Sequence, residues 1–207
     1  MLIDLHIHSN YQKDSPLSPK EIIARAKNTI LDGIVFTDNA IYNDVDELKR
    51  YGEEVGIVVL FGAEVHSDKG HMLVYLPDIS KFGDIIKPSD EPMSISDLVS
   101  MVNNLNGAVV AAHPYKKDVD RPLGDGLFTV EGLTAIEVES GFSDNTANIL
   151  AYDAASRLGI PMTGGSATKD NFDHLGLYAT LFSGRLTTEK ELVDKLKNGR
   201  YYPVNIL

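Results

Sequence analysis

Short runs of apolar, often β-branched residues alternate along the chain with longer segments in which apolar positions recur every three or four residues. The short runs predict strands, and the longer segments predict helices. The predicted strands are Leu2–Ile7, Gly33–Thr37, Ile57–Val65, His71–Leu76, Ala108–His113, Thr134–Glu139, Ile160–Gly164 and Leu177–Phe182. The predicted helices are Ser18–Asn28, Asn43–Val55, Ser94–Asn104, Asn145–Leu158 and Thr188–Asn198. This alternation is typical of an α/β protein with parallel strands.

The helix boundaries carry local signals of their own. In "SPKEIIARAKN", Ser18 can cap the helix, Pro19 suits its first position and Glu21 can complete a capping box. At the other end of the chain, Gly199 follows the last predicted helix as a C-cap residue would. These signals support the helical interpretation of both segments.

Polar residues share one face of the first predicted strand. In "LIDLHIHS", strand side chains alternate between two faces, so Asp4, His6 and His8 project to the same side. Burying three polar groups on one face of a core strand costs several kcal/mol unless something satisfies them. We therefore expect these residues to meet further functional groups there.

Other polar residues stand at the carboxyl ends of different predicted strands. They include Asp38, Glu64, His113 and the segment "GGSATK". Open sheets and closed β/α barrels both place their active sites at this edge. Because residues from nearly every strand are easier to assemble around a closed ring, the pattern favours a small, irregular β/α barrel.

Composition narrows the class of protein. A chain of 207 residues, 43% hydrophobic and 24% charged, is expected to form a single globular domain over residues 1–207. The net charge of −11 argues against binding to long nucleic acid, for which clustered Lys and Arg supply most of the affinity. No apolar run approaches the ~20 residues of a membrane helix, and the acidic Asp4 does not suit a signal peptide. We therefore expect a cytoplasmic protein with no membrane partner.

The chain has no cysteine, so any metal must be held by His, Asp, Glu or backbone oxygen. Histidines lie at several strand ends: His6 and His8 at the first, His71 opening "HMLVY" and His113 ending "VVAAH". With Glu64 within reach, this set suits zinc, manganese or iron. Histidines and a carboxylate around an open coordination position describe a hydrolytic metal centre.

These segments resemble the PHP (polymerase and histidinol phosphatase) family of phosphoesterases. The matching segments are "DLHIHSNYQKDS", "GIVFTDN", "GAEV", "GHMLVY", "AAHPY" and "GGSATKDNFDHLG", which follow the family order from Asp4 to Gly176. The resemblance implies a distorted seven-stranded (β/α) barrel with up to three divalent metals at its carboxyl face. It also implies that His6 and His8 bind one metal, that Glu64 bridges it to a second, and that His71 and His113 complete the second.

The resemblance assigns further roles to three aspartates. Asp14 takes the position of a ligand to the third metal, whereas Asp4 and Asp38 resemble carboxylates that orient histidines. The ligand role of His71 has a competitor in His66, which lies two residues beyond Glu64 on the same strand face. The apolar continuation after His71 matches the family and favours His71.

Three positions depart from the family pattern. Where the family usually has "TDH" the chain has "TDN", and where it usually has "GSDAH" the chain has "GSATK". Asn39 and Lys169 thus replace histidines of the third metal, and Ala167 replaces an aspartate. We hypothesise that the third site holds no metal, that Lys169 approaches Asp14 as a substitute cation, and that two metals remain.

The resulting hypothesis is a metal-dependent phosphoesterase that hydrolyses a small phosphomonoester or nucleotide. Lys169, together with Lys116 or Lys117, would stabilise charge on the phosphate, and Asn39 would contact the substrate. The segments Pro77–Pro92 and Lys116–Phe128 are the expected substrate-facing walls. The alternative hypothesis is a metal-binding domain with a regulatory or partner-binding role and little catalysis, since ligand positions have been substituted.

Overall fold

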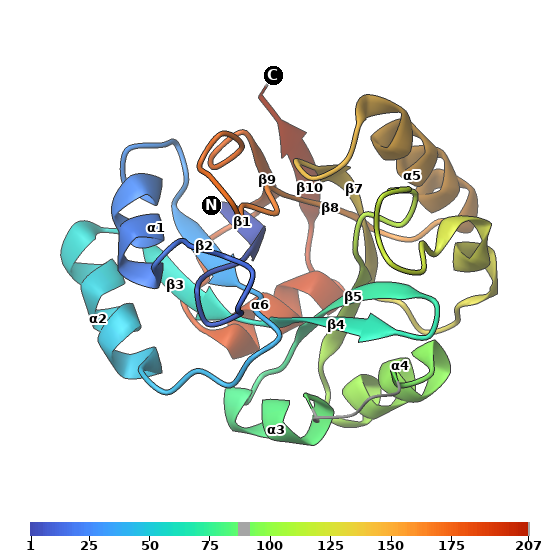
Figure 1. Ribbon diagram of the computed structural model, residues 1–207, viewed down its shortest axis with the longest axis horizontal. Helices are drawn as coiled ribbons and strands as arrows, with labels where there is room; N and C mark the ends of the chain where they lie inside the picture. The colour runs from blue at the N-terminus through green and yellow to red at the C-terminus, as the bar shows by residue number, and fades with distance from the viewer. Residues whose placement is uncertain (87–91, 207) are drawn as a thin grey trace.

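Two mixed β-sheets of five strands each form the centre of the computed structural model, which describes residues 1–86 and 92–206 (Figure 1). The first sheet has the order β10-β9-β1-β2-β3 and the second the order β4-β5-β6-β7-β8. The strands of the first sheet are β1 (Leu2–Ile7), β2 (Gly33–Phe36), β3 (Val58–Phe61), β9 (Tyr178–Phe182) and β10 (Tyr201–Asn205). Those of the second are β4 (Ala63–Ser67), β5 (Gly70–Tyr75), β6 (Ala108–Ala111), β7 (Ala135–Ser140) and β8 (Met162–Gly165).

Helices cover the outer faces of the sheets (Figure 1). The α-helices are α1 (Pro19–Ala26), α2 (Val45–Val55), α3 (Phe82–Ile85), α4 (Ile95–Asn104), α5 (Asn145–Leu158) and α6 (Glu189–Asn198), and the 3-10 helices are η1 (Ile79–Lys81) and η2 (Gly124–Thr129). Helices α1 and α2 share a core with the first sheet, and α3, α4 and α5 share one with the second. Within the described residues, no helix combines the length and the apolar character needed to cross a bilayer.

A third core cluster fills the space between the two sheets. It joins Ile3 and Leu5 of β1 to Tyr75 of β5 and Val110 of β6, and Leu192 of α6 closes one end. These side chains are almost fully buried, and the Tyr75 hydroxyl donates to the carbonyl of Leu5 at 2.8 Å. This apolar packing fixes the facing strands from which the polar residues project.

The predicted seven-stranded barrel is wrong, although the α/β class is correct. β5 pairs antiparallel with both β4 and β6, and β9 pairs antiparallel with both β1 and β10. The two sheets do not continue into one ladder. Isolated contacts join them instead, such as the bond from Glu64 N of β4 to the carbonyl of Thr37, which follows β2, at 2.7 Å, and the bridge between Ile7 and Thr168.

The differences from the predicted elements have local causes. The single strand expected over Ile57–Val65 divides at Gly62, where an added Cβ would lie 2.8 Å from the Tyr75 ring. The strand β10 lies outside the predicted strands, because Pro203 interrupts its apolar pattern. Proline is tolerated there because β10 is an edge strand.

Candidate metal centre

Four histidines and one glutamate meet in a cavity of about 320 Å³ at the ends of several strands. His6 belongs to β1 and His8 follows it, Glu64 lies on β4, His71 on β5, and His113 follows β6. The structure thus brings together all five residues that the sequence predicts for two metals. The volume lies at the lower end of the usual range for ligand pockets.

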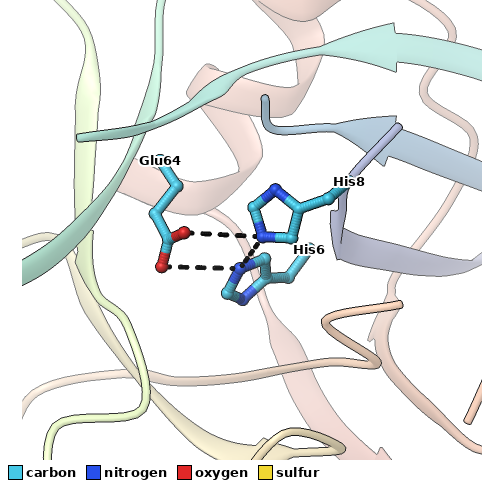
Figure 2. Close-up of side chains that lie close together, drawn as sticks. All are labelled: His6, His8 and Glu64. Atoms are coloured by element: carbon cyan, nitrogen blue, oxygen red, sulfur yellow. Dashed lines mark hydrogen bonds and ion pairs between the residues drawn. The ribbon is translucent and has the colours of Figure 1, made fainter. Parts of the chain in front are cut away.

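His6, His8 and Glu64 form the first group of possible ligands, as Figure 2 shows. The two Nε2 atoms lie 3.0 Å apart. The Glu64 carboxylate faces both rings, with Oε1 at 3.7 Å from His6 Nε2 and Oε2 at 3.4 Å from His8 Nε2. The three side chains therefore point at a common space.

Glu64, His71 and His113 form the second group. Glu64 Oε1 lies 3.2 Å from His71 Nδ1 and 3.0 Å from His113 Nε2. Glu64 is thus shared by both groups, as expected of a bridging carboxylate. His66 stacks on His71 with ring centroids 3.9 Å apart, but its side chain is 53% exposed and its Nε2 is 3.9 Å from Glu64. The His71 side chain is only 10% exposed, so the geometry favours His71.

The donor set fits a divalent transition metal. His8 Nδ1 and His71 Nε2 are buried nitrogens with no hydrogen-bond partner in the part of the chain that the structure describes. Each such group costs about 1–3 kcal/mol. They are not the ring atoms that face Glu64, so the fit to a cation rests on the converging atoms: the Nε2 atoms of His6 and His8 and the oxygens of Glu64 are nitrogen and oxygen donors of the kind that a divalent transition metal binds.

The electrostatics of the site centre on an ionised carboxylate. Burial favours neutral Glu64, but contacts with His113, His66 and His71 outweigh burial and hold its pKa well below the usual value. Burial also opposes charge on His6, but the carboxylates of Glu137 and Glu64 outweigh it and raise the His6 pKa to about 9. Burial lowers the pKa of His8 to about 3. Glu64 is therefore ionised and attracts cations.

Glu137 is the carboxylate that orients this site, a role the sequence does not reveal. The side chain is 1% exposed, its Oε1 lies 2.9 Å from His6 Nδ1, and its Oε2 accepts from the backbone N–H of His113 at 2.9 Å. On a neutral His6 ring this contact places the hydrogen on Nδ1 and leaves the Nε2 lone pair facing the cavity. Although Glu137, His6 and His113 lie close enough to hold an ion, both Glu137 oxygens already have partners. The one available signal is a glutamate in the buried run "AIEV".

The backbone around the centre is tightly constrained. A Cβ at Gly165 would lie 2.7 Å from His6 Cβ and 3.2 Å from Glu137 Oε1, so only glycine lets β8 approach so closely. His113 and Ala167 adopt positive φ values of 27° and 49°. Such conformations cost on the order of 1–3 kcal/mol in non-glycine residues and often mark functional sites.

Asp4 and Asp38 are buried, but neither contacts a histidine ring as expected. Asp4 Oδ1 accepts from the backbone N–H groups of His6, at 3.2 Å, and Ser166, at 2.9 Å. Asp38 accepts from the N–H and hydroxyl of Ser9, at 2.6 and 2.7 Å, and from the Tyr42 hydroxyl at 3.0 Å. Both carboxylates therefore hold the backbone that carries the histidines.

Lys169 reaches Asp14 at the wall of the same cavity, with Nζ 2.5 Å from Oδ2. This hydrogen bond lowers the pKa of Asp14. Asn39 and Ala167 also line the cavity. Lys116 does not. It lines a neighbouring hollow, where its Nζ lies 4.0 Å from the centroid of the Phe142 ring.

One of the two expected substrate-facing walls lies at the cavity. Asp118, Val119 and Asp120 of the segment Lys116–Phe128 line it. The described residues of Pro77–Pro92 do not. Four of them, Ile79, Ser80, Phe82 and Gly83, line a separate hollow, and residues 87–91 lie outside the described part of the chain.

Fold and site together define an α/β protein with a histidine–glutamate centre suited to divalent metals. The family model for the PHP domain matches residues 4–135. The chain therefore belongs to the PHP domain family, as the resemblance indicates.

Individual relatives are more distant. An uncharacterized protein from Methanocaldococcus jannaschii is 25% identical over 166 residues, which cover 74% of this chain and 90% of the relative. A candidate metal-dependent phosphoesterase from Bifidobacterium adolescentis has a TM-score of 0.62 at 18% identity, with 80% of this chain and 87% of the other covered. A lesion-specific endonuclease from Pyrococcus furiosus has a TM-score of 0.69 at 19% identity, covering 98% of this chain but only 57% of the endonuclease. At such identities the two structures establish the shared fold.

Proposed function

We propose that the protein is a metal-dependent phosphoesterase that hydrolyses a small phosphomonoester. The observation that carries this proposal is the convergence of four histidines on Glu64 in one cavity. His6, His8 and Glu64 would hold one divalent ion, and Glu64, His71 and His113 a second, with zinc, manganese or iron as the suitable elements. Ions bound there supply Lewis acidity towards phosphate oxygens and lower the pKa of an attacking water.

The remaining polar side chains of the cavity would bind the substrate. Lys169 donates one N–H to Asp14, which leaves the other donors of its ammonium for phosphate oxygens. Asn39 lies on the same cavity wall and offers a neutral amide. The ion pair of Lys169 with Asp14 also supports the hypothesis that a lysine replaces a third metal there.

Acidic residues at the cavity favour a small substrate over a nucleic acid. Asp118 and Asp120 add negative charge to a chain whose net charge is already −11. Further phosphate groups next to a bound phosphomonoester would be repelled by these carboxylates. In this proposal the protein shares its fold with the endonuclease but does not share the nucleic-acid substrate.

The test is reversible loss of metal and activity. Treatment with a chelator should abolish hydrolysis of an aryl phosphate, and added Mn²⁺ or Zn²⁺ should restore it. Glu64→Gln should lower kcat/KM by at least about 100-fold, because both ion sites lose a charged ligand worth several kcal/mol. The matched control is Glu131→Gln, which makes the same change at an exposed glutamate.

The alternative, a metal-binding domain without catalysis, is distinguished by the same experiment. Tight stoichiometric metal without metal-stimulated turnover of any phosphate ester would contradict the phosphoesterase and favour the alternative. Ala167 is the residue that supports this alternative. Its methyl group lines the cavity at a position where a carboxylate could bind metal. Full turnover by Glu64→Gln would contradict the bridging role.

A further inference from the structure

An exposed aromatic ring stands beside the metal centre. Phe142 lies in the turn between β7 and α5, is 41% exposed and lines the cavity that holds the histidines. Its ring centroid is 5.5 Å from that of His113, at an angle of 68°. His113 Nε2 in turn contacts Glu64 at 3.0 Å. A group attached to a phosphate at the centre would therefore reach the Phe142 ring directly.

Phe142 forms a partition between this cavity and a second hollow. Phe142, Ala167 and Lys169 line both spaces, whereas Lys116 lines only the second. The Lys116 ammonium packs on the ring at 4.0 Å from its centroid, a cation–π contact. Lys116 thus supports the ring from the side of the second hollow, and the ring presents its other side to the cavity. The Ala167 methyl group leaves the space beside it free.

From this geometry we infer that Phe142 is a specificity residue that stacks on a planar ring in the leaving group of the substrate. The inference rests on the proposed function and narrows the substrate class to phosphomonoesters with an aromatic or heteroaromatic ring close to the phosphate. Apart from Val119 and Ala167, the other described side chains that line the cavity are polar or charged, so Phe142 offers the one flat apolar surface among them, and a planar ring matches it better than an alkyl or sugar group does. Stacked aromatic pairs contribute beyond their buried area, so a planar ring should bind about three- to tenfold more tightly than a puckered ring of the same size.

The test compares benzyl phosphate with cyclohexylmethyl phosphate, which are both esters of primary alcohols and differ in the planarity of the ring. The wild type should show a kcat/KM ratio of about three to ten in favour of benzyl phosphate. Phe142→Leu should bring this ratio to about one, since it keeps an apolar side chain but removes the ring. Phe142→Tyr should preserve the ratio. Tyr152→Ala, which removes an exposed aromatic from α5, is the control and should not change it.

Binding of the non-hydrolysable benzylphosphonate and cyclohexylmethylphosphonate to the Mn²⁺-loaded protein separates this inference from the proposed function. If benzylphosphonate binds more tightly and Phe142→Leu removes the difference, the inference holds even when neither ester is hydrolysed. Hydrolysis of both esters with equal kcat/KM by wild type and Phe142→Leu would overturn the inference and leave the phosphoesterase intact. Failure of both phosphonates to bind would also overturn it.

Discussion

Replacing Glu137 with glutamine tests whether an orienting carboxylate sets the metal affinity. The Glu137 oxygens serve two buried donors, His6 Nδ1–H and the His113 backbone N–H, both at 2.9 Å. A glutamine amide has one oxygen, so one of the two donors would face an NH₂ group. The change is nearly isosteric and leaves the residues proposed to hold metal in place.

The expected cost follows from this count of acceptors. One unsatisfied buried donor costs about 1–3 kcal/mol of folding free energy. Loss of a carboxylate that orients a metal-binding histidine typically weakens metal binding about 10- to 100-fold, because the ring is no longer held in the orientation and tautomer that bind metal. Glu137→Gln should therefore weaken metal binding to this extent and lower the free energy of unfolding of the metal-free protein by the cost of the unsatisfied donor.

The assay is competition for Zn²⁺ or Mn²⁺ against a chromophoric chelator of known affinity. Glu139→Gln is the control, because this residue lies on the same strand and its carboxylate contacts Asn205 rather than a histidine. A dissociation constant for Glu137→Gln within twofold of the control would refute the reasoning. So would weakened binding with no loss of stability in the metal-free protein.

Two further predictions concern a buried aspartate and the substituted ligand positions. Burial raises the pKa of Asp38 from 3.8 to about 6, so the stability that its neutral form contributes is complete below pH 3.8 and is lost as the pH rises through 6. As the pH rises from about 4 to 7, the wild type should therefore lose more unfolding free energy in urea titrations than Asp38→Asn does. The difference should be on the order of 2–3 kcal/mol, at about 1.36 kcal/mol per pKa unit. Equal losses in the two proteins would contradict burial as the origin of the pKa shift. The double change of Lys169→His and Asn39→His should raise bound metal by about one ion per chain in elemental analysis, and an unchanged content would argue against Lys169 as a substitute cation.

Much of the candidate site could be predicted because its residues follow strand periodicity. Asp4, His6 and His8 alternate with apolar residues, and this alternation alone places them on one face of the strand. The sequence predicts Glu64 and His113 at strand ends, where side chains of neighbouring strands converge; His113 does follow β6, whereas Glu64 lies near the start of β4, just beyond the end of β3. The approach of Lys169 to Asp14 can be expected once both are placed at the same sheet edge. The side-chain directions are thus set largely by local backbone geometry.

Other features depend on contacts between distant segments, which the local sequence does not specify. The direction of β5 relative to β6 is set by the hairpin with β4, and an apolar run looks alike in parallel and antiparallel sheets. For this reason the barrel prediction is wrong. The role of Glu137 depends on its meeting His6, 131 residues earlier in the chain. Asp38 is expected near a histidine ring, but Ser9 and Tyr42 use its oxygens.

The central claim is that imidazoles from separate strands and one shared carboxylate bind a pair of ions. Anomalous diffraction from crystals grown with Mn²⁺ or Zn²⁺ tests this claim most directly, since it locates each ion independently of the protein density. The account predicts two peaks on either side of Glu64, one next to His6 and His8 and one next to His71 and His113. A cavity without a peak in the presence of saturating metal would contradict it.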